Sequence, residues 1–213
     1  MRREQKPRKI RDTILILTNG RQTEKNYFEN ITSQYKTMFT IKVKYFNGQC
    51  DSMVDEAIQL DNQQYNQIWC VFDIDDSLLE GHLIKAMQKA RKHGIHMAYS
   101  NEAFEVWLLN HLTENVRPGL NRKTYIKEIN TLLNKDGSNL SYKKNDLDLL
   151  KDKFLPKALE ATQRAKKTHQ RLIVEHQKEN RGNTNYPIWD WKSTTTVYQL
   201  MEALQLISLD LDN

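Results

Sequence analysis

The sequence is poor in cysteine and contains no long apolar run. Its two cysteines, Cys50 and Cys70, lie far apart rather than in a C-x-x-C pair, and Cys70 falls inside an apolar segment where a small buried thiol is expected. This usage predicts a reducing, cytoplasmic location. No apolar stretch approaches the roughly 20 residues that a helix needs to cross a membrane. No hydrophobic core follows the N-terminal charges either, so we expect neither a membrane contact nor a secretory signal.

The motifs of several common enzyme classes are also missing. Gly20 is a lone glycine after the first apolar segment, so the chain has neither a dinucleotide-binding fingerprint nor a phosphate-binding P-loop. The six histidines are scattered, and none is paired with cysteines at the spacing of a zinc site. These absences argue against a dehydrogenase, a kinase and a zinc protein. They also leave the chain without a nucleotide-hydrolysis motif of its own.

The charge balance is mildly basic, with 32 Lys and Arg against 27 Asp and Glu and a net charge of +5. Much of the surplus lies in residues 1–11, which we interpret as a flexible tail that either aids solubility or attracts a phosphate backbone. More cations follow in the C-terminal half, including Lys143, Lys144, Lys166 and Lys167. They are typical either of solvated helix faces or of contacts to nucleic acid, and the sequence leaves both interpretations open.

Strand and helix patterns alternate along the first half of the chain. Residues 13–17 and 67–73 are almost continuously apolar, as expected of central strands covered on both faces, whereas 39–46 alternates apolar residues with lysine and predicts a half-exposed edge strand. A fourth strand is predicted at 95–99, and helices at 23–35, 51–65, 77–93 and 103–112. This order predicts an α/β domain over residues 12–112 with a doubly wound, largely parallel sheet.

The second half reads as helical. Helices are predicted at 123–133, 146–179 and 195–206, after a break at Pro118-Gly119. The Ser77 to Glu80 segment fits a capping box, so both residues are assigned to starting a helix and not to chemistry. We therefore expect residues 113–213 to form a helical extension that packs on the α/β domain.

Acidic residues follow both apolar strands. Asp73 and Asp75 end the second strand, and Glu24 comes shortly after the turn at Asn19-Gly20 that ends the first. In open α/β sheets, function gathers beyond the carboxyl ends of the strands. Clustered carboxylates suit Mg²⁺ or Mn²⁺, which activate water and neutralise charge in phosphodiester cleavage. We predict that Glu24, Asp73 and Asp75 converge at one sheet edge and hold such a metal.

Glu105 is a fourth acidic candidate. On the predicted helix it shares a face with Leu108, Leu109 and Leu112, so a carboxylate lies within an apolar stripe. A buried carboxylate needs a cation, a hydrogen-bond donor or a metal. The alternative is a partly exposed first-turn Glu that the helix dipole favours. Its position after the fourth predicted strand favours the first interpretation, in which Glu105 is a further ligand or an orienting acid.

Several blocks of the sequence resemble one family, the RloB-like proteins. The resemblance rests on Asn19-Gly20-Arg21-Gln22-Thr23-Glu24 with Tyr27-Phe28, on Val71-Phe72-Asp73 with Asp75, on Ser100-Asn101 with Phe104-Glu105-Val106-Trp107-Leu108-Leu109, and on Thr194-Thr195-Thr196-Val197-Tyr198. It implies a Toprim-like fold and a metal-dependent nuclease of prokaryotic phage defence or abortive infection. It further implies an ATPase partner of the AAA or ABC type, and leaves tRNA, other RNA and DNA open as substrates.

One position departs from the pattern that the resemblance implies. Toprim-like families usually carry a catalytic glutamate before the glycine that follows the first strand, and here that residue is Asn19. Asparagine can bind a metal through its carbonyl oxygen but cannot act as a base. Glu24 could then take part of the role, and Arg21 in the same turn joins the lysines as a candidate nucleic-acid contact. The alternative is a non-catalytic nucleic-acid-binding or regulatory subunit, with a homo-oligomer open in either case.

Overall fold

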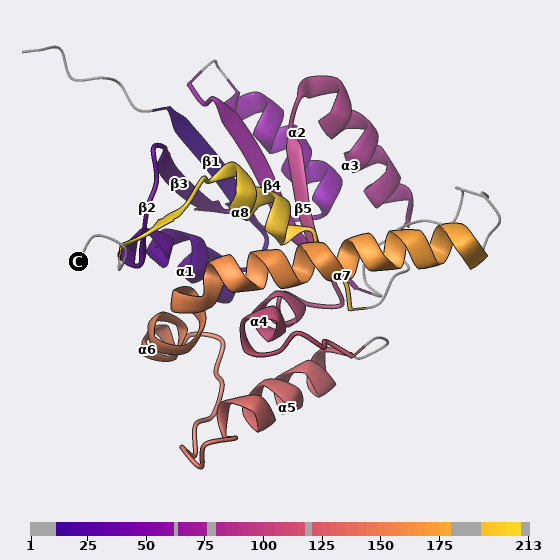
Figure 1. Cartoon of the computed structure of the whole chain (residues 1–213). Coiled ribbons are helices and arrows are strands. Elements are labelled where there is room, and N and C mark those ends of the chain that lie inside the picture. Colours follow the sequence, from indigo (N-terminus) through magenta and orange to yellow (C-terminus); the bar gives the residue numbers. More distant parts are fainter. Residues whose placement is uncertain (1–11, 62–63, 76–79, 118–120, 180–192, 210–213) are drawn as a thin grey trace, which may run out of the picture.

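The fold is built around a four-stranded parallel sheet (Figure 1). The computed structural model describes residues 12–61, 64–75, 80–117, 121–179 and 193–209. The strands are β1 (Thr13–Thr18), β3 (Thr40–Tyr45), β4 (Gln67–Ile74) and β5 (His96–Asn101), in the order β3-β1-β4-β5. Each pairs in parallel with its neighbour, so all four carboxyl ends lie at the same edge. The prediction of a parallel α/β sheet is confirmed.

Helices cover both faces of the sheet. Successive residues of β1 point to opposite faces, so Leu15 and Leu17 pack into one apolar cluster while Ile14 and Ile16 pack into the other. The first cluster lies beneath α2 (Cys50–Leu60) and α3 (Glu80–His93). The second packs against α1 (Thr23–Asn30), α4 (Glu105–Leu112), α7 (Ala158–Glu179) and α8 (Val197–Ala203). Burial on both faces explains why the central strands are apolar throughout.

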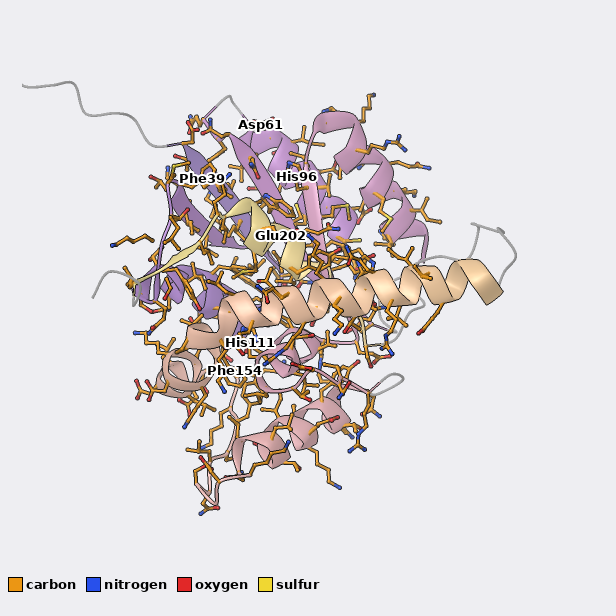
Figure 2. The ribbon with its side chains drawn as sticks, in the orientation of Figure 1. Phe39, Asp61, His96, His111, Phe154 and Glu202 are labelled. Carbon is orange, nitrogen blue, oxygen red and sulfur yellow. The ribbon has the colours of Figure 1, made fainter. Side chains whose placement is uncertain are left out.

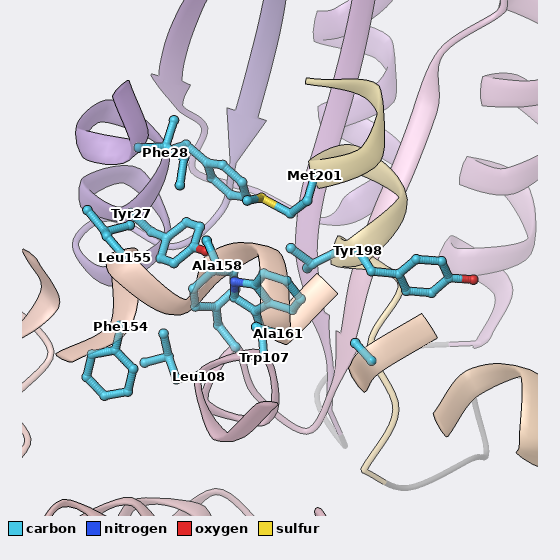
Figure 3. Packing of buried hydrophobic residues seen from close by; sticks show 14 of the residues in the cluster. Tyr27, Phe28, Trp107, Leu108, Phe154, Leu155, Ala158, Ala161, Tyr198 and Met201 are labelled. Carbon is cyan, nitrogen blue, oxygen red and sulfur yellow. The ribbon is translucent and has the colours of Figure 1, made fainter. Parts of the chain in front are cut away.

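The C-terminal half is helical, as the sequence predicted. It contains α5 (Arg122–Leu133), the short α6 (Leu147–Leu149), α7 and α8, and α4 lies between α7 and α5 (Figure 1). Trp107 of α4 is fully buried, and its ring lies among side chains of α1, α7 and α8 (Figure 3). One apolar cluster thus runs from Ile14 to Leu204 and joins the helical half to the sheet. The proposed division at residue 112 stays a prediction.

The edge position of β3 also agrees with the sequence. Lys42 and Lys44 are exposed, while Ile41 and Val43 pack partly against the core. The lysines keep this open edge soluble and discourage pairing with another chain. Cys70 is fully buried, as expected, and Cys50 is buried as well.

The helix predicted at 23–35 is wrong in its last part. The α-helix ends at Asn30, a 3₁₀ turn follows at Ile31–Ser33, and β2 (Tyr35–Lys36) pairs antiparallel with β6 (Ile207–Ser208). The Tyr35 hydroxyl donates a hydrogen bond to the Pro156 carbonyl at 2.9 Å. Both partners are distant in the chain, so the local pattern carried no sign of this strand.

The single helix predicted at 146–179 is also wrong. After α6, the chain passes through a π-helical turn at Leu150–Phe154 and a 3₁₀ turn at Leu155–Lys157 before α7 begins. Pro156 has no N–H to continue a helix, which accounts for part of the interruption. The predicted helices at 51–65, 103–112 and 195–206 are shorter at one end or both. Thr195, for example, forms a β-bridge with Ser100 instead of starting α8.

Some predicted features lie outside the described residues. They are the basic tail 1–11, Ser77 of the capping box and the Pro118-Gly119 break. Among the helices that the structure does describe, none combines the length and the apolar character that crossing a membrane requires.

Candidate functional site

A cavity of about 380 Å³ opens where β1 and β4 end. The two strands are adjacent, with Thr18 opposite Val71, and the Asn19 amide donates to the Val71 carbonyl at 3.2 Å. The segments that leave them therefore emerge side by side. Asn19 and Glu24, which follow β1, and Asp73 and Asp75, at the end of β4 and just after it, all line the cavity. The structure thus brings these four predicted site residues together at the carboxyl edge of the sheet.

Glu24 reaches this cavity from the first turn of α1, with its carboxylate pressed against Gly20. A Cβ atom added at Gly20 would stand 1.7 Å from Glu24 Oε2 and 1.8 Å from Glu24 Cδ. Residue 20 therefore has to be glycine for the carboxylate to take this place. Burial raises the pKa of Glu24, and the nearby Glu105 carboxylate adds to the rise, while Lys144 and Arg122 oppose it.

Asp73 is the most strongly perturbed acid of the site. Burial is the largest cause, and the charges of Glu24 and Glu105 add to it, so the pKa of Asp73 lies well above its usual value despite the opposing charges of Arg122 and Lys144. Three carboxylates thus stand close enough to repel one another. Such a cluster favours either a proton or an added cation.

Glu105 lies behind the cavity and not on its lining. Its side chain is almost fully buried in the first turn of α4, as the apolar stripe suggested. The Tyr142 hydroxyl donates to Glu105 Oε1 at 3.3 Å, and Lys144 Nζ lies 3.5 Å from the same oxygen. The Thr23 hydroxyl donates to the Lys144 carbonyl at 2.9 Å and fixes this segment beside α1. Glu105 therefore has a hydrogen-bond donor and a cation as partners, which together stabilise a buried carboxylate.

Arg122, at the start of α5, was not among the residues singled out from the sequence. Its Nη2 atom lies 3.0 Å from Asp73 Oδ2 and 3.8 Å from Asp75 Oδ2, and donates to the Glu102 carbonyl at 3.2 Å. Arg122 also lines the cavity. No sequence signal pointed to it, because it is far from Asp73 in the chain and stands in a helix rich in other cations.

Two sequence blocks of the family resemblance hold this edge of the sheet together. The Thr194 hydroxyl donates to Asn101 Oδ1 at 2.7 Å, and the Thr195 and Ser100 hydroxyls lie 2.9 Å apart. All four side chains are buried. Their bonds tie the end of β5 to the segment before α8. These four side chains therefore support the carboxyl end of β5 from inside the protein.

The five predicted nucleic-acid contacts do not form one surface. Arg21 and Lys144 line the acidic cavity, and Lys143 is an exposed neighbour that does not. Lys166 lies 2.6 Å from Glu202 Oε1, and Figure 2 shows Glu202 on α8 beside α7. Lys167 lines a separate cavity of about 510 Å³ along α7. Only Arg21 and Lys144 are therefore placed beside the acids.

The donor atoms suit a hard divalent cation. Within the described ranges, no three Asp, Glu, His or Cys side chains are already grouped as a metal site. Instead, the Arg122 guanidinium stands between Asp73 and Asp75 and shows that a positive charge is accommodated there. Carboxylate oxygens of Asp73, Asp75 and Glu24, with the amide oxygen of Asn19, are the ligand types of Mg²⁺ and Mn²⁺. The chemistry fits, provided that Arg122 moves aside.

Fold and site together define a class: an α/β protein whose parallel sheet carries an acidic cavity at its carboxyl edge. The sequence model of the family described as RloB-like protein matches residues 14–204. The chain therefore belongs to the RloB-like family, which confirms the resemblance seen in the sequence. No curated protein and no solved structure matches the chain. The Toprim-like assignment of the fold stays a prediction.

Proposed function

We propose that this protein is a metal-dependent nuclease of prokaryotic phage defence, which cleaves phosphodiester bonds in RNA, with tRNA among the candidates, or in DNA. The observation that carries the proposal is the meeting of Asn19, Glu24, Asp73 and Asp75 around one cavity at the sheet edge. The defence role and an AAA or ABC-type ATPase partner follow from the family resemblance, and the cytoplasmic location follows from the cysteine usage. A homo-oligomer is compatible with this assignment.

In this proposal, Asp73 and Asp75 hold Mg²⁺ or Mn²⁺, with Glu24 as a third ligand or as the base. The bound metal supplies charge neutralisation at the scissile phosphate and an activated water. Burial and the Glu105 carboxylate raise the pKa of Glu24, which makes this carboxylate a stronger base than an exposed glutamate. Asn19 adds a neutral oxygen and cannot take up a proton.

Glu105 serves as an orienting acid in the same proposal. Its carboxylate is kept in place by the Tyr142 hydroxyl and by Lys144. Burial and the Glu105 charge raise the pKa of Tyr142, so this hydroxyl stays protonated and keeps donating. Arg21 and Lys144 line the cavity as cations that can contact phosphate oxygens of the nucleic acid.

The competing candidate is a non-catalytic nucleic-acid-binding or regulatory subunit. Asn19 favours it, because the neutral amide removes a charge and a base from the site. The Arg122 contact to Asp73 favours it as well, since the guanidinium balances part of the acidic charge without a metal. The two candidates differ in whether the acids are needed for cleavage.

The test is a cleavage assay with purified protein on tRNA, other RNA and DNA, with Mg²⁺ or Mn²⁺ and with any ATPase that is encoded beside the gene. We expect Asp73→Ala to abolish cleavage because a metal ligand is lost, and Asn19→Glu to maintain or raise it. Asp148→Ala, an exposed acid on α6, is the control and keeps full activity. If no substrate is cut and Asp73→Ala leaves the cellular phenotype intact, the nuclease proposal is wrong and the protein is the non-catalytic subunit.

A further inference from the structure

Arg122 links the helical half of the protein to the acidic cavity. The carboxylates around the cavity come from the end of β4, the residue after it and the first turn of α1, whereas Arg122 is the first residue of α5. Its guanidinium lies 3.0 Å from the Asp73 carboxylate and 3.8 Å from that of Asp75. The Arg122 side chain is 42% exposed. Arg122 is therefore held by the acids while it keeps access to the open cavity.

The site carries more negative than positive charge. Among the described residues, the four carboxylates of Glu24, Asp73, Asp75 and Glu105 outnumber the cations Arg21, Arg122 and Lys144, and Lys144 is directed to Glu105. Arg122 is thus the cation that the structure places directly on Asp73 and Asp75. A divalent metal would take the same carboxylate oxygens at about 2.0–2.1 Å for Mg²⁺. A metal on these oxygens would stand within a few ångströms of the guanidinium, and the two positive charges would repel each other.

We propose that Arg122 competes with the divalent metal for Asp73 and Asp75, and that metal binding frees its guanidinium to bind a phosphate oxygen of the substrate. This inference rests on the proposed function. A guanidinium presents several N–H donors in a planar fork that matches phosphate as well as carboxylate. The released side chain needs no change in α5, because it already lines the cavity that the acids surround. Metal loading and substrate binding are then coupled through one residue.

The first test measures metal affinity by calorimetry with MgCl₂ and MnCl₂ alone. We expect Arg122→Met to bind metal about five- to tenfold more tightly than the wild type, since a half-exposed ion pair to the ligands is removed. Lys123→Met removes a charge from the exposed neighbouring residue and leaves the affinity unchanged. Arg122→Lys keeps a cation, so its metal affinity should lie between those of the wild type and Arg122→Met. Circular dichroism establishes that each variant is folded.

The second test measures binding of fluorescein-labelled oligo-uridine and oligo-thymidine, with Ca²⁺ to limit cleavage or with EDTA. We expect Arg122→Met to weaken binding several-fold in Ca²⁺ and to have little effect in EDTA, where Arg122 stays on Asp73. If Arg122 had only a structural role, its replacement would change the oligonucleotide affinity equally in Ca²⁺ and in EDTA. Equal metal affinity of wild type and Arg122→Met overturns this inference alone. If neither protein binds metal, the proposed metal-dependent function fails and the inference fails with it.

Discussion

The carboxylate of Glu24 fills the space in which residue 20 would otherwise carry its Cβ atom. With 1.7 Å between that position and Glu24 Oε2, only glycine leaves room. The Gly-x-x-x-Glu pattern at the end of β1 is therefore one structural unit. The glycine is required for the position of an acid and not for an unusual backbone angle.

Gly20→Ala should disturb the site and leave the fold in place. The methyl group pushes the Glu24 carboxylate away, so we expect metal affinity and cleavage to fall at least tenfold. The free energy of unfolding should change by about 1 kcal/mol or less, because the loss of chain entropy in the unfolded state partly offsets the strain. Gly81→Ala is the control: its Cβ meets no atom within 4 Å in α3, and the change should stabilise the helix by about 0.5–1 kcal/mol. Calorimetric metal titration and urea unfolding measure the two effects.

Asp73→Asn should make stability less dependent on pH when metal is removed with EDTA. The pKa of Asp73 is raised in the folded protein, so the folded state binds more protons than the unfolded state. This contribution is complete below the unfolded pKa and is lost as pH rises through the folded pKa. The variant should therefore gain in Tm relative to the wild type as pH increases. Saturating Mg²⁺ should raise the Tm of the wild type and not that of the variant, and the opposite order would contradict the proposed ligand role.

His111 should make the protein sensitive to acid. It is fully buried, its Nδ1–H donates to the Trp107 carbonyl, and its Nε2 accepts from the Tyr27 hydroxyl at 3.0 Å. Figure 2 shows His111 and Phe154 beneath α7, and the His111 ring meets the Phe154 ring edge-on. Burial lowers the pKa of His111 to about 3.

The unfolded state, with a His pKa of about 6.5, binds the extra proton first as pH falls. The contribution of His111 is therefore complete above that value and declines toward pH 3, by up to about 1.4 kcal/mol per pH unit. Urea unfolding at a series of pH values should show a shallower decline for His111→Gln than for the wild type. His93→Gln, at an exposed position, should leave the profile unchanged.

Lys144→Met should weaken binding of single-stranded oligonucleotides and reduce the slope of log Kd against log salt by about one contact, or roughly 0.7. Lys144 lines the acidic cavity, whereas Lys166 does not line it and pairs with Glu202 of α8. We therefore expect Lys166→Met to leave both affinity and slope near the wild-type values. Fluorescence anisotropy over a range of KCl concentrations measures both. A larger loss of affinity with Lys166→Met than with Lys144→Met would indicate that the oligonucleotide binds at α7 instead.

Local patterns were sufficient to predict the sheet and to group half of the residues of the candidate site. Strands β1 and β4 could be found because a central parallel strand is buried on both faces and needs apolar side chains throughout. Glu24 and Asp73 could be grouped because neighbouring parallel strands bring their carboxyl ends to one edge. Glu105 was suspected for a similar reason, since a charge within an apolar helical stripe is visible in the spacing alone.

The tertiary structure decided which distant groups meet these acids. Tyr35 lies in a strand and not in the predicted helix. It pairs with Ser208 and donates a hydrogen bond to the Pro156 carbonyl, and both residues are far away in the chain. Arg122 and Lys144 reach Asp73 and Glu105 from segments whose own patterns show only ordinary exposed cations. Ion pairs of this kind depend on distance in space, and the periodicity of a sequence reports only which face of its own element a residue occupies.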